Sequence, residues 1–250
     1  MRRWVLPPLL LAALAGIWQV AATNGTIADA LGIEPFLVPS TSEVASALWE
    51  SRGLLADNAW VTLREILLGF GCALVLGLGF AVAMRLSETL RLAAYPLVVA
   101  SQTIPIIVIA PILVTWFGFG IVPKLLIVAL ICFFPIAVTT LDGLRSVDPA
   151  ALKLMRTLDA SRWQTFRRVE IPTALPASFS GAKVAVVIAP IGAVFAEWTG
   201  SSSGLGHLIL QDNAQLEVAR EFAAIVVLSA IALTLFAIVS VAERLIVTWR

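Results

Sequence analysis

A short run of small residues late in the chain is the first candidate for chemistry. Residues 200–204 read Gly-Ser-Ser-Ser-Gly, and the only histidine of the chain, His207, follows three residues later. This matches the G-x-S-x-G pattern, in which the central serine is a nucleophile and a histidine acts as its base. The pattern requires a strand, a sharp turn and a helix, whereas this segment stands between two long apolar stretches. We therefore interpret it as a turn, and a single histidine also excludes an H-E-x-x-H zinc site.

ATP binding through a phosphate loop is excluded by comparing the chain with that motif. None of the three lysines, Lys124, Lys153 and Lys183, follows a glycine, so the chain lacks the G-x-x-x-x-G-K-[ST] phosphate loop. If ATP drives this protein, a separate subunit must bind it. We expect no cofactor, no metal site and no catalytic residue in this chain, and we do not expect an enzyme.

Ionisable residues inside the apolar stretches could carry protons or ions, but they are sparse. Arg64 and Glu65 lie near the outer end of one stretch, and Glu197 lies near the outer end of another. No acid falls at middle depth, which weakens an ion-coupled carrier. Glu197 precedes Trp198, which indicates a residue at the membrane interface; the alternative is that Glu197 faces a substrate path.

A basic block, residues 153–168, interrupts this apolar chain. Ser161 is suited to cap a helix that begins at Arg162, and Asp159 tolerates a left-handed turn. The apolar residues of the block are Leu154, Met155, Leu158, Trp163 and Phe166. Aromatic, methionine and arginine side chains in one protruding patch are typical of protein interfaces. The alternative is a positive cluster that meets anionic lipid.

The elements that position these residues are long apolar segments. Hydrophobic residues make up 60% of the chain, charged residues 13%, and the mean hydropathy is +0.96. A helix needs about 20 mostly apolar residues to cross a bilayer. Six stretches qualify: Trp4–Ala22, Val61–Met84, Ala94–Trp116, Ile121–Leu141, Lys183–Thr199 and Phe222–Ala242. We predict a single all-α, polytopic membrane domain over 1–250, with a first span and outer segment in 1–60 and a five-helix core in 61–243.

Charge asymmetry orients these segments. With the N-terminus inside, thirteen of the seventeen lysines and arginines fall on the inner side. The positive-inside rule therefore places both termini and the 142–182 loop in the cytoplasm. The first apolar run could instead be a secretory signal, but its length favours a retained span.

Three local patterns add detail outside the basic block. Ser40 and Glu43 fit a capping box, which predicts a short surface helix, or else a solvated connector. Asp57 or Asn58 is expected to cap the second span. Small residues recur every fourth position in that span, which favours close internal packing over a subunit interface. They are Gly69, Ala73, Gly77 and Ala81.

Prolines make the third span unusual. Pro105 and Pro111 each remove a backbone donor, and carbonyls freed at membrane depth are tolerated inside protein or along a watery cavity. We interpret this segment as a kinked helix that lines a pathway, with Gln102 and Thr103 as polar lining; a kinked packing helix is the alternative. Pro172 and Pro176 are expected to end the element that carries the basic block.

The basic block resembles the signature of permease subunits of bacterial ABC importers. That signature reads E-A-A, three residues, Gly, nine residues, a branched apolar residue, any residue, an apolar residue and Pro. Here Asp159 holds the glycine position and Val169-Glu170-Ile171-Pro172 closes the motif, whereas Lys153-Leu154-Met155 replaces the acidic opening. Further segments typical of the nitrate, sulfonate and taurine branch are Val38-Pro39-Ser40, Trp116–Gly120 and Gly143–Pro149. The segment Leu154–Leu158 is most similar to permeases for thiamine-precursor pyrimidines or riboflavin.

This resemblance implies a complete import machine in the bacterial inner membrane. Two permease copies, most simply a homodimer, would form the pathway between two cytoplasmic ATPase subunits and an extracytoplasmic binding protein, with no nucleic acid involved. Residues 153–163 would be a coupling helix seated in the ATPase. The resemblance assigns coupling to Lys153, Arg156, Asp159, Ala160, Ser161, Arg162, Trp163, Phe166 and Pro172. The pathway would be lined by Gln102, Thr103, Pro105, Pro111 and Glu197.

Other functions remain as alternatives. An importer of aliphatic sulfonates, taurine or nitrate would have the same architecture. An ion-coupled secondary carrier would show internal repeats, which are not visible in this chain. A membrane enzyme is disfavoured by the lack of catalytic clusters.

Overall fold

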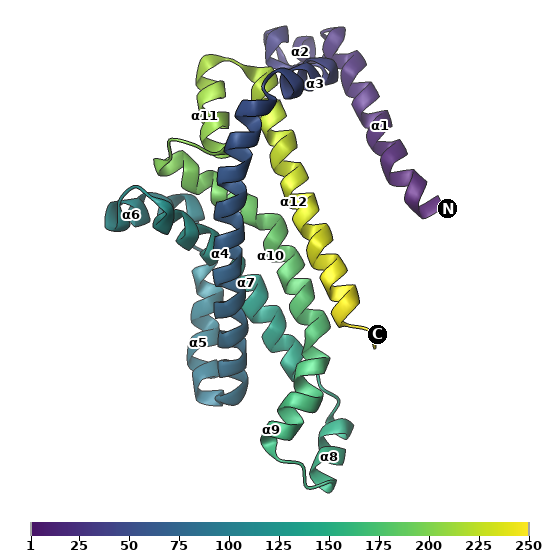
Figure 1. Cartoon of the computed structure of the whole chain (residues 1–250), viewed down its shortest axis with the longest axis vertical. Coiled ribbons are helices and arrows are strands. Elements are labelled where there is room, and N and C mark those ends of the chain that lie inside the picture. The colour runs from purple at the N-terminus through teal and green to yellow at the C-terminus, as the bar shows by residue number, and fades with distance from the viewer. Residues whose placement is uncertain (1, 250) are drawn as a thin grey trace. The chain divides into compact units, whose positions relative to one another are not determined.

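The computed structural model describes residues 2–249, and all regular structure in this range is helical (Figure 1). The early helices are α1 (Arg2–Thr23), α2 (Thr26–Leu31), η1 (Pro35–Leu37), α3 (Thr41–Glu50), α4 (Arg52–Leu86), α5 (Glu88–Ser101) and α6 (Ile106–Phe117). The later ones are α7 (Ile121–Arg145), α8 (Pro149–Thr157), α9 (Arg162–Thr165), η2 (Phe166–Glu170), α10 (Ile171–Gly200), α11 (Leu205–Gln215) and α12 (Val218–Ile246).

The helices form two compact units. The first comprises the residues up to Val61 together with Ser202–Ser229, and the second comprises Thr62–Ser201 with the residues from Ala230 onward. The unit boundaries fall within α4, after Val61, and within α12, after Ser229, so each of these helices belongs partly to both units.

The expected all-helical membrane architecture is confirmed. Within residues 2–249, four helical segments are long and apolar enough to cross a bilayer: Arg52–Leu86, Ile121–Arg145, Arg162–Gly200 and Val218–Ile246. The pair α5 and α6 makes a fifth crossing if it is counted as one bent span. The sixth expected crossing corresponds to α1, whose apolar part, Leu9–Thr23, is shorter.

Small residues bring α4 close to α7 in the second unit. A Cβ added to Gly69 would lie 2.5 Å from Cβ of Val128, and one added to Gly77 would lie 2.9 Å from Cγ2 of Ile136. Ala73 in the same row is fully buried. The four-residue spacing therefore serves internal packing, as the sequence indicates.

The start of α4 differs from the prediction. The helix begins at Arg52, because Leu55 N–H already donates to the Ser51 carbonyl at 2.9 Å and no proline interrupts the following turns. Asn58 therefore lies inside the helix and not at its cap. Its side-chain amide donates to the Leu54 carbonyl at 2.8 Å, and its side-chain oxygen accepts from Gly204 N–H at 2.7 Å.

The third predicted span is broken where a kinked helix was expected. The axes of α5 and α6 differ by 100°, with the break at residues 102–105. Pro96 and Pro111 are accommodated within their helices, whereas Pro105 stands in extended conformation at the cap of α6. A proline disfavours helical geometry at the residue that precedes it. Pro105 therefore favours an extended conformation at Ile104, which separates α5 from α6.

The prolines after the basic block do not end its helix. Residues from Arg162 to Gly200 form one continuous helical segment that contains Pro172 and Pro176. Pro172 is the second residue of α10 and stands just after the π-helical turn η2, in which the Ile171 N–H donates to the Phe166 carbonyl. Local π-type adjustments of this kind let a membrane helix tolerate a proline. The expected stop is therefore wrong.

The first unit contains the predicted surface helix α3. The Ser40 hydroxyl accepts from Glu43 N–H at 3.3 Å, and the Glu43 carboxylate accepts from Ser40 N–H at 2.7 Å, so the capping box is confirmed. The Ser40 N–H, and the Ser40 hydroxyl at 2.8 Å, both donate to the Glu43 carboxylate and hold the pKa of Glu43 below its ordinary value. Trp18 of α1 donates from Nε1 to the Pro39 carbonyl at 2.9 Å, which anchors the segment that leads into α3.

Candidate functional site

The basic block forms a small helical knob, which we define as α8, the turn 158–161 and α9. In Figure 1 the knob lies beyond the ends of α7 and α10, the two helices that carry it. The segment 153–163, expected as one coupling helix, is divided by a turn at residues 158–161. The division follows from the local sequence at both ends of the turn.

A Schellman motif ends α8. Asp159 has φ 51°, as its identity predicted, and its N–H donates to the Arg156 carbonyl at 3.1 Å. Ala160 N–H donates to the Met155 carbonyl at 3.0 Å, which completes the motif. Aspartate can replace the glycine of the signature here because its short polar side chain tolerates the left-handed conformation.

A capping box begins α9. The Ser161 hydroxyl accepts from Gln164 N–H at 3.2 Å, and the Gln164 side chain accepts from Ser161 N–H at 2.8 Å. The predicted cap at Ser161 is confirmed. A cap of this kind stabilises a helix by about 1 kcal/mol, so the turn is held from both sides.

The two aromatic residues of the block have different environments. Phe166 is buried and packs with Leu144 and Ala174, which joins the knob to the core of the second unit. Trp163 stacks on Phe166 at 5.7 Å between ring centroids but is 62% exposed. Leu154 and Leu158 are also exposed. The knob thus presents an apolar, aromatic surface on a fixed base, which is what a protein partner requires.

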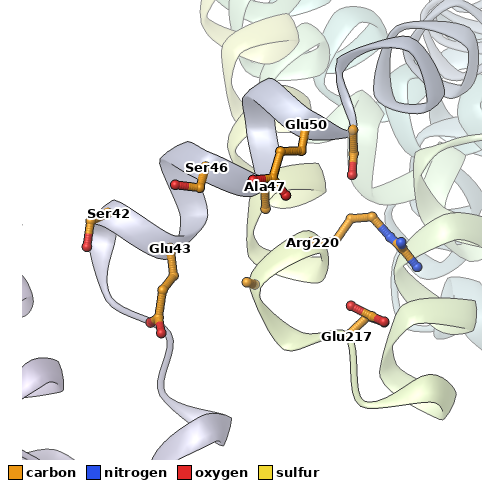
Figure 2. A pocket seen from close by; sticks show the side chains of 9 residues that line it. Ser42, Glu43, Ser46, Ala47, Glu50, Glu217 and Arg220 are labelled. Atoms are coloured by element: carbon orange, nitrogen blue, oxygen red, sulfur yellow. The ribbon is translucent and has the colours of Figure 1, made fainter.

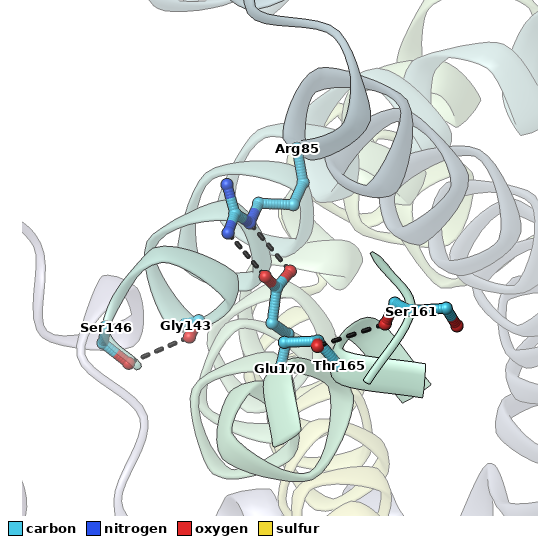
Figure 3. Close-up of polar contacts among 6 residues, drawn as sticks. All are labelled: Arg85, Gly143, Ser146, Ser161, Thr165 and Glu170. Carbon is cyan, nitrogen blue, oxygen red and sulfur yellow. Dashed lines mark hydrogen bonds and ion pairs between the residues drawn. The ribbon is translucent and has the colours of Figure 1, made fainter. Parts of the chain in front are cut away.

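An ion pair that the sequence analysis missed fixes the base of the knob. Arg85, at the end of α4, donates to the Glu170 carboxylate from Nε at 2.9 Å and from an Nη at 2.6 Å (Figure 3). Glu170 is buried within η2. A bidentate guanidinium–carboxylate pair fixes orientation as well as distance. The sequence does contain one signal for this ion pair: Glu170 is an acidic residue at the variable position between the apolar residues Val169 and Ile171.

The remaining coupling residues are surface residues of this region. Lys153, Arg156 and Arg162 are exposed, and Pro172 stands in the first turn of α10 beside η2. The structure thus gathers the predicted coupling residues into the knob and its base.

The predicted pathway residues are placed less uniformly. Gln102 and Thr103 lie in the break between α5 and α6 and are exposed, and the Thr103 hydroxyl donates to the Ala100 carbonyl at 2.8 Å. Pro105 is the N-cap residue of α6, and Pro111 lies inside this helix. Glu197 is only 1% exposed and accepts from the Thr62 hydroxyl at 2.6 Å. Its position at the membrane interface or along a substrate path stays a prediction.

A second buried ion pair lies in the same unit as Glu197. Lys124 of α7 donates to Glu65 of α4 at 2.6 Å and to the Ser201 hydroxyl, after α10, at 2.6 Å. Both charged side chains of this pair are largely buried. The pair ties the interior of α4 to the start of α7 and the end of α10. The positions of these charges in the sequence do not show that they meet.

The first unit contains a polar pocket of about 410 Å³ between α3 and the start of α12 (Figure 2). Glu43, Glu50, Glu217 and Arg220 line it. Arg220 is bound to the fully buried Asp212 at 2.7 Å, so its charge is already compensated. The pocket is consequently acidic.

The described residues contain no group of three or more histidine, cysteine, aspartate or glutamate side chains that could hold a metal ion.

Comparisons with known proteins place this geometry in a family. Residues 73–248 match the family model of the binding-protein-dependent transport system inner membrane component. A probable ABC transporter permease protein of Haemophilus influenzae is 39% identical over 94% of this chain and 93% of its own. The formylaminopyrimidine transport permease protein ThiX of Halalkalibacterium halodurans is 36% identical over 98% of this chain and 95% of its own. The riboflavin transport system permease protein RibX of Chloroflexus aurantiacus is 35% identical over 97% of this chain and 89% of its own.

Solved structures support the same fold. An inward-facing structure of the MetNI methionine ABC transporter superposes with a TM-score of 0.62 and 21% identity, covering 80% of this chain and 97% of that chain. The apolar helices, the knob and the family match together identify the protein. The chain belongs to the binding-protein-dependent transport system inner membrane components, and it is a multi-pass permease subunit of an ABC importer.

Proposed function

We propose that this permease imports a small, neutral, polar heterocycle, such as a thiamine-precursor pyrimidine or a flavin, from a binding protein into the cytoplasm. Two of the similar proteins are named for a formylaminopyrimidine and for riboflavin, which supports this substrate class. The chain itself adds a physical argument. No charged residue occurs between Arg91 and Lys124, the stretch that contains the broken span. An anionic sulfonate or nitrate would meet no compensating cation along this segment.

Hydrogen bonding suits such a solute better. Gln102 and Thr103 supply an amide and a hydroxyl at the break, and irregular backbone at membrane depth offers further donors and acceptors. In this proposal Gln102, Thr103 and the residues near Pro105 and Pro111 line the pathway. Two copies of the chain would face each other across it. The buried Glu197 would stabilise the pathway wall without touching the solute.

The proposed motor is a pair of ATPase subunits that bind ATP and grip the cytoplasmic knob. The single observation that carries this part is the exposed Trp163 on a knob whose base is fixed by Phe166 and by the Arg85–Glu170 pair. A push on the knob would reach α4 through this ion pair and α10 through the continuous helix Arg162–Gly200. The two access states need differ by only a few kcal/mol in such contacts. Both termini of the permease would be cytoplasmic.

Transport in proteoliposomes tests the proposal. The reconstituted complex with its binding protein should take up labelled formylaminopyrimidine or riboflavin in preference to taurine, and preferential uptake of taurine would overturn the substrate class. Trp163→Ala should leave membrane insertion intact while uptake per ATP hydrolysed falls by about tenfold or more. Trp249→Ala, which removes another exposed tryptophan outside the knob, is the matched control. Wild-type coupling in the Trp163 variant would overturn the role of the knob.

A further inference from the structure

A polar cavity of about 470 Å³ lies between the turn that joins α4 to α5 and the knob. Its charged lining residues are Arg85, Glu88, Arg156, Arg162 and Glu170. Leu152 and Phe166 close its apolar side. The cavity is therefore bounded by the same elements that fix the knob to the second unit.

The charges of this cavity are not balanced within the chain. Arg85 is bound by Glu170, and Glu88 forms an ion pair with Arg91. The side chains of Arg156 and Arg162 make neither a hydrogen bond nor an ion pair with any residue that the structure describes. Two uncompensated guanidinium groups thus face one cavity.

The helix dipole can account for a positive charge at only one of these two positions. Arg156 lies in the last turn of α8, where a cation interacts favourably with the helix dipole. Arg162 is the first residue of α9, where the dipole disfavours a positive charge. The charge at Arg162 therefore works against its own helix, and no side chain that the structure describes offsets it.

Resting on the proposed function, we propose that this cavity receives an acidic side chain of the ATPase subunit, held between Arg156 and Arg162. A guanidinium group binds a carboxylate through two parallel hydrogen bonds, so two arginines would fix both its position and its orientation. A protein partner is favoured over a lipid headgroup because the exposed apolar residues Leu154, Leu158 and Trp163 belong to the same knob. Lys153-Leu154-Met155 stands where the signature has its acidic opening, so the knob lacks a negative charge there. The more positive charge of the knob favours an acidic partner.

The experiment measures the affinity of the permease in nanodiscs for the ATPase subunit of its own complex. Arg156→Glu and Arg162→Glu should each weaken binding by about tenfold or more, and reversing one acidic residue of the ATPase to arginine should restore it. Glutamate at position 162 suits the start of α9, so this variant is expected to keep its fold. Arg168→Glu is the matched control, since Arg168 is exposed near the knob but does not line the cavity. Equal loss in this control would show a general charge effect and overturn the proposal.

A lipid arm and a tryptophan arm separate the remaining outcomes. The same variants are compared in nanodiscs of phosphatidylcholine alone and with added phosphatidylglycerol. Unchanged ATPase affinity together with lost binding of phosphatidylglycerol would assign the cavity to a lipid headgroup. If Trp163→Ala weakens ATPase binding while the two arginine variants do not, this inference fails and the proposed function stands. If the wild-type permease does not bind the ATPase, the proposed function itself fails.

Discussion

Removing the two partners of the Arg85–Glu170 pair one at a time should cost unequal amounts of stability. The side chain of Glu170 is 10% exposed, and that of Arg85 is 31% exposed. Arg85→Ala leaves a buried carboxylate without its cation, which costs about 3 kcal/mol. Glu170→Ala leaves a guanidinium that reaches water, so the loss should be nearer ~1 kcal/mol. The order of the two losses follows from burial alone.

Equilibrium unfolding of the solubilised permease in mixed micelles measures both losses. The double variant Arg85→Ala/Glu170→Ala should be no less stable than Arg85→Ala alone, because no charge is then left buried and unpaired. In proteoliposomes, both single variants should lower uptake per ATP hydrolysed, since the base of the knob loses its link to α4. Equal losses for the two single variants, or losses that add in the double variant, would refute this reasoning.

Three further predictions test the packing, the turn and the cap. Gly181→Ala should destabilise the second unit by ~1–3 kcal/mol, because the added Cβ would lie 2.6 Å from a backbone oxygen of α7. Gly79→Ala should be tolerated, because its added Cβ would have no other atom within 4 Å. Thermal unfolding of the two variants distinguishes these outcomes. Asp159→Gly should keep coupled transport, whereas Asp159→Val should cost about 1–2 kcal/mol at the left-handed turn, as shown by faster proteolysis of the knob. Because hydrogen bonds lower the pKa of Glu43 in the folded protein, its contribution to α3 should be complete above the ordinary carboxyl value of 4.5 and lost as pH falls through the lowered value. Hydrogen exchange of α3 amides in wild type and in Glu43→Gln over this pH range checks it, and a pH dependence that is the same in both would contradict the role of the Glu43 carboxylate.

Local sequence rules predicted the features that depend on neighbouring residues. Ser161, Asp159 and the Ser40–Glu43 capping box were all identified from side chains that satisfy backbone groups a few residues away. The apolar segments and their helical character followed from composition in the same way. Such features are encoded within one or two helical turns.

Features that depend on distant residues could not be read in this way. Arg85 and Glu170 are 85 positions apart, and Thr62 and Glu197 are 135 apart. Proline spacing indicated a distortion near Pro105, but whether a proline kinks a helix or breaks it depends on what packs around it. Pro172 and Pro176 show the opposite error, because the helix continues through both of them, with a π-helical turn just before Pro172.

The central claim is that the knob faces the cytoplasm and is covered by the ATPase. A Thr157→Cys variant, with Cys72 and Cys132 replaced by alanine, tests both parts through labelling by a maleimide that cannot cross membranes, since Thr157 is exposed on the knob and is not one of the proposed coupling residues. We predict labelling in inside-out vesicles but not in spheroplasts, and protection of this cysteine when the ATPase is bound. Labelling from the outer side, or equal labelling with and without the ATPase, would contradict the claim.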